Sequence, residues 1–171
     1  MAPRFWLAAM VSALAGCGFS PVYAPGPGGA PQANLARVFV AVIPNRDGQL
    51  LRQALKARLE GSGASAAALY TLAVGYGISS EGIGINPDSS TSFIRFEARA
   101  NWRLLSAAPG APPLASGVAV AQDGYSVIVD QYFYSNLSNA AIDRRFADAI
   151  ANQIVIRLAA YFRNRGKVAS R

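Results

Sequence analysis

Residues 92–104 read "SFIRFEARANWRL" and alternate between two kinds of side chain, which is the pattern of a half-buried β-strand. One set of alternate positions is apolar: Ile94, Phe96, Ala98, Ala100, Trp102 and Leu104. The other set is mostly charged or polar: Phe93, Arg95, Glu97, Arg99, Asn101 and Arg103. Such a strand is typical of an antiparallel sheet that is covered on one side only. The segment therefore predicts a sheet with one free face that carries arginines.

The flanking segments predict three more strands. The first is residues 36–45, "ARVFVAVIPN", which are rich in β-branched side chains and close with proline. The second is residues 69–79, "LYTLAVGYGIS", in which large apolar residues alternate with unusually small ones. The fourth is residues 114–129, "LASGVAVAQDGYSVIV", which return after a hairpin connection at 106–116.

Two segments have the periodicity of amphipathic helices. Residues 46–63 place Leu51, Leu55 and Leu59 four apart and end in glycines. Residues 135–165 carry a longer apolar stripe, which we interpret as core packing: Ile142, Phe146, Ile150, Ile154, Leu158 and Tyr161. Ser138 or Asn139 is the expected N-cap of this second helix, with Asp143 in its first turns.

The element order is strand, helix, three strands, helix. This order predicts an α+β fold in which two helices pack on one face of a four-stranded, mostly antiparallel sheet. We expect a single domain over residues 35–165, followed by a basic, disordered tail at 166–171.

The N-terminus has the features of a lipoprotein signal. A positive start, Met1 to Arg4, precedes the apolar run "FWLAAMVSALA", which is too short to span a bilayer as a helix of about 20 residues. The next residues, Leu14 to Cys17, are similar to the bacterial lipobox, and Cys17 is the only cysteine. We expect cleavage of residues 1–16 and a covalent N-acyl diacylglycerol on Cys17. The alternative is an ordinary secretory signal with an incidental cysteine.

The acylated cysteine would begin a tether at residues 17–34, which are rich in proline and glycine. Two or three acyl chains hold a protein on a membrane, because each buried CH₂ contributes about 0.8 kcal/mol. Gly18 follows Cys17 where aspartate would retain a lipoprotein at the inner membrane of enteric bacteria. We therefore expect the protein on the inner leaflet of the outer membrane, facing the periplasm.

The composition argues against catalysis and against nucleic-acid binding. The chain has no histidine, and its one cysteine is assigned to lipid, so the commonest nucleophile–base pairs are missing. The glycine-rich segment "GYGISSEGIGI" lacks the strand-to-helix setting of a dinucleotide loop. The formal charge of +7 would suit nucleic acid, but export behind a signal peptide argues against that partner. We expect no metal and no cofactor other than the lipid.

Arginine supplies nearly all of the positive charge and suits phosphate and carboxylate groups. The candidate contacts for lipid head groups or an acidic protein surface are Arg95, Arg99 and Arg103 on the predicted strand, and Arg144 and Arg145 on the predicted helix. Two alternatives stay open. One is that a high-GC genome enriches arginine throughout the chain. The other is that the strand arginines form a solvated face, which Glu97 neutralises in part.

Three stretches together resemble the LptE family of lipopolysaccharide-assembly lipoproteins. They are "AGCGFSPVY" (15–23), "SSTSFIRFEARANWRLL" (89–105) and "SNAAIDRRFADAIANQIVIRLAAYF" (138–162). The resemblance implies a non-catalytic outer-membrane lipoprotein with two helices on a four-stranded sheet. In that family the protein plugs the β-barrel translocon LptD, helps it assemble and binds lipopolysaccharide.

Enteric members of the family carry their lipopolysaccharide-binding basic residues in a strand-end loop and near the second helix. Here the loop at residues 83–90 has no basic residue. This sequence therefore departs from the family's pattern, and the candidate contacts for lipopolysaccharide are Arg95, Arg144 and Arg145. The alternative function is a periplasmic lipid-binding or transport-auxiliary lipoprotein that has no barrel partner.

Overall fold

The computed structural model describes residues 30–60, 67–85, 91–108, 110–126 and 132–169. The elements in chain order are α2 (Ala30–Leu35), β1 (Val38–Val40), α3 (Asn45–Leu59), β2 (Tyr70–Ile85), β3 (Thr91–Ser106), β4 (Ala115–Ser126) and α4 (Tyr132–Ala169). Cys17, the expected signal peptide at 1–16 and the tether up to residue 29 lie outside the described residues.

The strands form one mixed sheet in the order β1-β2-β3-β4. The short β1 pairs with β2 in parallel, through Val38 opposite Tyr70 and Val40 opposite Leu72. The other pairs are antiparallel, with Leu72 opposite Leu104 and Ala100 opposite Ala119. The predicted α+β class with a four-stranded, mostly antiparallel sheet is confirmed.

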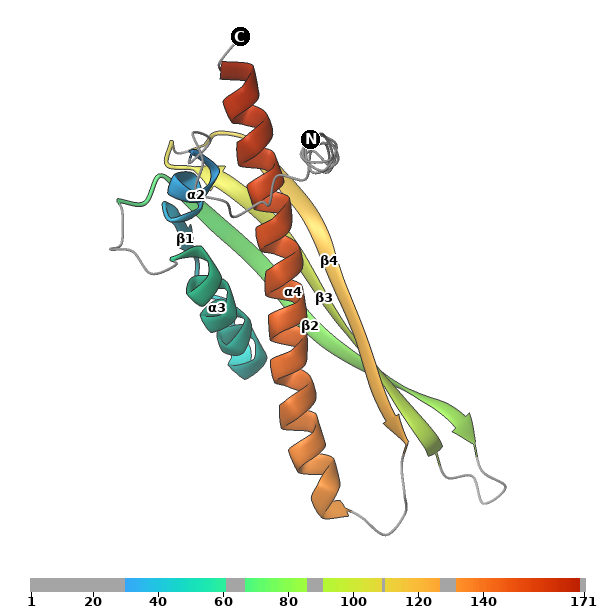
Figure 1. Cartoon of the computed structure of the whole chain (residues 1–171). Helices are drawn as coiled ribbons and strands as arrows, with labels where there is room; N and C mark the ends of the chain where they lie inside the picture. The colour runs from blue at the N-terminus through green and yellow to red at the C-terminus, as the bar shows by residue number, and fades with distance from the viewer. Residues whose placement is uncertain (1–29, 61–66, 86–90, 109, 127–131, 170–171) are drawn as a thin grey trace, which may run out of the picture.

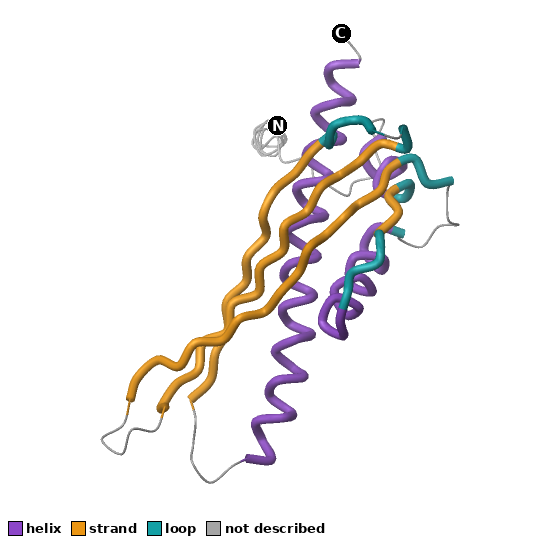
Figure 2. Tube along the Cα trace, turned by 180° about the vertical axis from the view of Figure 1, so that it is seen from behind, coloured by secondary structure: helices purple, strands orange, loops and turns teal. Residues whose placement is uncertain are grey.

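The two long helices lie on one face of this sheet (Figure 1). Seen from behind, the strands lie in front of α4, with α3 to one side of them, and no helix crosses the strands on that side (Figure 2). The molecule is therefore built of two layers, with a helical layer and a sheet whose second face is open. Helix α2 also belongs to the helical layer, because it packs against α4.

The core lies between the two layers. Helix α3 contributes the predicted Leu51, Leu55 and Leu59, which are all buried. Helix α4 contributes more buried apolar side chains than any other described element, including Ile150 and Ile154. The sheet contributes Val38, Val40, Leu72, Val74, Ala98, Ala100, Trp102, Leu104 and Ala119. Full burial of one such large aliphatic side chain stabilises the fold by about 1.5–3 kcal/mol.

Several sequence-based boundaries were wrong. Helix α4 begins at Tyr132, so Ser138 and Asn139 lie inside the helix and are not its N-cap. Serine and asparagine cost less than about 1 kcal/mol inside a helix relative to alanine, which is too little to stop one. The helix also continues through residues 166–169, which the sequence analysis assigned to the tail. Residues 170–171 lie outside the described part.

The region before α3 differs from expectation in two ways. The short helix α2 covers residues 30–34 of the predicted tether together with Leu35, the predicted first residue of the domain. Strand β1 ends at Val40, and residues 41–44 leave the sheet after the Ala41 N–H donates to the Leu72 carbonyl at 3.0 Å. Pro44, which has no N–H, stands directly before α3 and cannot extend the ladder. Tyr161 is only partly buried, and its neighbour Phe162 is the residue in the core.

None of the described helices combines the length and the apolar composition needed to cross a membrane.

Candidate functional site on the open face of the sheet

The outward positions of β3 carry the arginines predicted from the alternation. Arg95, Arg99 and Arg103 are exposed, whereas the intervening Ala98, Ala100 and Trp102 are buried beneath the helices. Because alternate side chains of a strand point to opposite faces, the three guanidinium groups share the face that the helices leave open. We call this row of three the arginine row.

Strand β2 leaves the space beside the arginine row almost empty of side chains. Ala73, Gly75 and Gly77 lie opposite Arg103, Asn101 and Arg99 in the antiparallel register. A Cβ added at Gly77 would have no atom within 4 Å, and one at Gly75 would have only the Asn101 carbonyl oxygen, at 4.0 Å. The long arginine side chains therefore stand next to a strip of bare backbone.

The three arginines of the row differ in whether they form an ion pair. Glu97 accepts hydrogen bonds from Gln122 Nε2 at 2.9 Å and from Arg99 at 3.0 Å. These two hydrogen bonds, the Gln122 bond first, hold the pKa of the Glu97 carboxyl below its usual range. Arg95 and Arg103 form no ion pair with any residue that the structure describes. Two of the three guanidinium groups are therefore available for an anionic partner.

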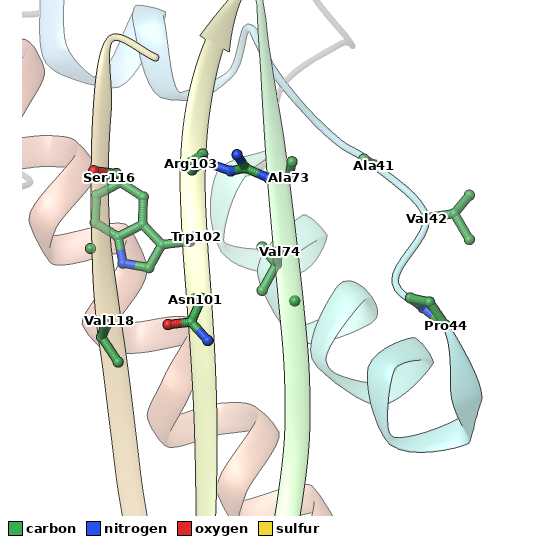
Figure 3. Close-up of a pocket in the computed structure, with 12 residues that line it drawn as sticks. Ala41, Val42, Pro44, Ala73, Val74, Asn101, Trp102, Arg103, Ser116 and Val118 are labelled. Atoms are coloured by element: carbon green, nitrogen blue, oxygen red, sulfur yellow. The ribbon is translucent and has the colours of Figure 1, made fainter. Parts of the chain in front are cut away.

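The open face is hollowed at two places. One shallow depression of about 650 Å³ is bounded by Ala41, Val42 and Pro44 on one side and by Asn101, Arg103 and Val118 on the other. Figure 3 shows Arg103 reaching from β3 across toward Ala73 on β2, with Val42 and Pro44 on the separate chain segment beyond it. A second depression of about 510 Å³ lies over Gly75–Ser79, beside Glu97 and Arg99.

The predicted helix arginines lie elsewhere. Arg145 donates to Asp123 Oδ2 of β4 at 2.8 Å, which ties the N-terminal half of α4 to the sheet. Arg144 is exposed beside it. Because α4 covers the face opposite the arginine row, the structure does not bring the five candidate arginines into one site (Figure 1).

Two features of this face were missed by sequence reasoning. One is the wall formed by residues 41–44, with Val42 exposed to 78%. The other is the exposed apolar ring of Phe39, which is 48% exposed on the edge strand β1. The proline at position 44 was the available signal that the first strand ends early.

Comparison with solved structures shows the same fold in bacterial proteins. A protein from Caulobacter crescentus is 21% identical and superposes with a TM-score of 0.61, over 79% of this chain and 97% of that one. The minor lipoprotein of Acinetobacter baumannii is 17% identical, with a TM-score of 0.56 over 73% and 92% of the two chains. Rare lipoprotein B of Shewanella oneidensis is 12% identical, with a TM-score of 0.57 over 75% and 98%.

Among curated protein sequences, none matches this chain. The sequence profile of the family described as LptE, lipopolysaccharide-assembly, matches residues 35–158. That range runs from the end of α2 through all four strands to the buried centre of α4, so it covers both layers and the arginine row. This protein therefore belongs to the LptE family of lipopolysaccharide-assembly proteins.

Proposed function

We propose that this protein is an outer-membrane lipoprotein that plugs and helps to assemble an LptD-type β-barrel for lipopolysaccharide transport. The observation that carries the proposal is the family match over residues 35–158. In this proposal acyl groups on Cys17 anchor the chain to the inner leaflet of the outer membrane, and the folded part faces the periplasm. The role is non-catalytic.

The open sheet face supports a place inside a barrel. Barrel lumens are polar, so a plug needs a polar surface to contact the wall. The outward side chains of β3 and β4 include Arg95, Asn101, Arg103, Ser116 and Gln122, which are all exposed. The helices meanwhile bury the apolar side of the sheet within the protein itself.

The distribution of charge supports direct binding of lipopolysaccharide. This lipid carries phosphates and sugar-acid carboxylates, which guanidinium groups bind through paired hydrogen bonds. Arg99 and Arg145 already pair with Glu97 and Asp123. Among the five candidate arginines, Arg95, Arg103 and Arg144 are therefore the ones that we assign to the anionic ligand.

Affinity purification from bacterial membranes tests the assembly role. The full chain, tagged at its C-terminus, is expected to recover a large β-barrel protein, and its depletion is expected to lower surface lipopolysaccharide. The matched control is Cys17→Ala, which cannot be acylated and should lose the membrane anchor. Recovery of no barrel protein, with normal surface lipopolysaccharide after depletion, would contradict the proposal and favour a lipid-binding lipoprotein without a barrel partner.

A further inference from the structure

The two sides of the sheet differ in how far the rest of the chain pairs with their backbone groups. At the β4 edge, two side chains of α4 cover carbonyl groups that point away from β3. Gln153 Nε2 donates to the Val120 carbonyl at 2.8 Å, and the Arg157 guanidinium donates to the Val118 carbonyl. These bonds occupy acceptors that a further strand would need.

Within the described part of the chain, the edge of β2 has no paired strand beyond Leu72, although Val42 and Pro44 flank it at Val74 and Gly75 across the first depression. Strand β1 pairs only with Tyr70, Thr71 and Leu72, and the last bond on this side is from the Ala41 N–H to the Leu72 carbonyl. In a regular strand, alternate residues direct both backbone groups to the same side. Leu72 directs its backbone groups toward β1. The backbone N–H and C=O groups of Val74, Tyr76 and Ile78 therefore point to that same side of β2. Beyond Leu72, no described residue pairs with them there.

This edge also lacks the features that usually keep strand edges from pairing. Residues 73–83, "AVGYGISSEGI", contain no proline, lysine or arginine, and Glu81 is their only charge. Gly75 and Gly77 weaken the strand because glycine is flexible. A Cβ at either position would meet no described atom closer than 4.0 Å, so no close contact among the described residues requires glycine there. Glycine within a strand is also found where another chain approaches closely.

We propose that the free edge of β2, from Val74 to Ile83, binds an extended segment of a partner protein as an added strand. Its acidic side chains would alternate with apolar ones. Strands in a sheet lie about 4.8 Å apart, so the added strand would lie about 10 Å from β3. Because Gly75 and Gly77 carry no side chain, acidic groups of the segment reach across them to Arg103, and to the N–H donors of Arg99 that its bond to Glu97 leaves free. Apolar groups of the segment turn toward the helical layer, beside Tyr76 and Ile78.

A second copy of this chain fits this edge poorly. Two copies joined through β2 would each present only Glu81 to the other's arginine row, and the chain as a whole carries a formal charge of +7. Charge complementarity thus favours an acidic segment from another protein. Any exported protein with such a segment would fit, so this inference does not rest on the barrel assignment.

Hydrogen exchange resolved by residue tests the proposal on the full lipoprotein in detergent. The probe is a blocked peptide of about nine residues in which valine alternates with glutamate, a length that matches the free edge. Without peptide, the Val74, Tyr76 and Ile78 amides should exchange fast, and those of Ala73, Gly75 and Gly77 should exchange slowly. Peptide should slow the first set by at least about tenfold and leave the second set unchanged. Absence of this alternating protection would overturn the proposal.

Peptide controls separate strand addition from simple charge attraction. The same peptide, methylated on the amides that would face β2, should give no protection, because it cannot donate to the edge. A peptide of alternating valine and lysine should bind more weakly than the glutamate peptide. Equal binding of the methylated peptide, or protection of these amides by lipopolysaccharide but not by peptide, would contradict an added strand.

Protein variants test the role of the arginine row and the glycines. Arg103→Glu should weaken glutamate-peptide binding by about tenfold, whereas Arg163→Glu, on the exposed end of α4, should not change it. Gly77→Val fills the strip beneath the acidic side chains and should also weaken binding. Valine favours strands, and a Cβ at position 77 would have no described atom within 4 Å, so we expect this variant to fold. Unchanged peptide affinity in both Arg103→Glu and Gly77→Val would overturn the assigned orientation.

Discussion

At the scale of single residues, two buried polar atoms lack hydrogen-bond partners within the described part of the chain, Tyr76 Oη and Trp102 Nε1. Burial, followed by the negative charges of Asp47 and Asp143, raises the pKa of the Tyr76 hydroxyl to about 12. An unsatisfied buried hydroxyl costs about 1–3 kcal/mol of stability. The Tyr76 hydroxyl therefore lowers the stability of the fold, while the Tyr76 ring packs against the core.

The variant Tyr76→Phe is expected to raise the free energy of unfolding by about 1 kcal/mol, because it removes the unpaired hydroxyl and keeps the ring. Urea unfolding followed by circular dichroism measures the change. Tyr70→Phe is the matched control, because the Tyr70 ring packs on Phe162 and its hydroxyl is not among the buried unpaired atoms. A loss of stability in Tyr76→Phe would show that the hydroxyl has a partner.

Asp143 predicts a pH dependence of stability. Burial, and then the nearby negative charge of Asp47, raises the pKa of this carboxyl, while Arg46 acts in the opposite direction. A raised pKa means that the folded state binds the proton more tightly than the unfolded state. The stability that this contributes is present below the unfolded pKa of about 3.9 and is lost as the pH rises through the folded pKa.

Asp143→Asn is therefore expected to be more stable than the native protein at neutral pH, with the difference shrinking as the pH falls toward 3. Unfolding free energies measured across this pH range test the prediction. The control Asp148→Asn removes a carboxylate that pairs with Arg58 at 2.9 Å, so it should instead be slightly less stable at neutral pH. A constant difference between Asp143→Asn and the native protein at all pH values would contradict the assignment.

At the scale of elements, α4 has two functions in the fold. Its buried stripe forms much of the core, and its side chains Gln153 and Arg157 cover the edge of β4. Gly117 allows this close approach, because a Cβ there would lie 2.9 Å from Trp102 and 3.2 Å from the Arg157 guanidinium. One helix thus covers the sheet and closes one of its edges.

Replacement of the guanidinium tests this second role. Arg157→Met keeps the aliphatic stem but frees the Val118 carbonyl, so we expect a loss of about 1 kcal/mol in the free energy of unfolding. We also expect self-association that rises with protein concentration, because the β4 edge becomes available for pairing. Chemical unfolding and sedimentation velocity measure the two effects. Arg163→Met, further along α4, should show neither effect, and identical behaviour of the two variants would contradict an edge-closing role.

At the scale of the whole molecule, the two layers separate stability from recognition. The apolar contacts lie between the helices and the sheet, whereas the exposed arginine row lies on the face of the sheet that the helices leave open. Arg95 and Arg103 are exposed and form no ion pair with the described residues. Changes on the open face should therefore alter binding with little effect on folding.

The double variant Arg95→Glu with Arg103→Glu is expected to reduce capture of lipopolysaccharide or of the barrel partner by at least about tenfold while the thermal midpoint changes little. The matched control is Arg163→Glu with Arg165→Glu, which changes the net charge equally at the exposed end of α4. Ligand capture and thermal unfolding are measured for both pairs. Equal losses in the two pairs would show that net charge alone governs binding, and that the arginine row is a solvated face.

Much of this architecture was predictable from local patterns. The alternation in residues 92–104 predicted which side chains of β3 are buried and which arginines share the open face. The leucine spacing of α3 predicted its buried side, and three short stretches predicted the family to which the chain belongs. The acylation of Cys17 and the tether stay predictions, because residues 1–29 lie outside the described part.

By itself, the sequence determined the periodic features, because a strand repeats every two residues and a helix about every 3.6 residues whatever the surroundings. Only the tertiary structure decided which arginines are paired, since the Arg145–Asp123 contact depends on where α4 crosses β4. It also decided that α4 closes the β4 edge, through a bond between residues 39 positions apart, while β1 leaves the β2 edge open. Such contacts depend on register and helix placement, which the packing of the whole core sets and no local pattern encodes.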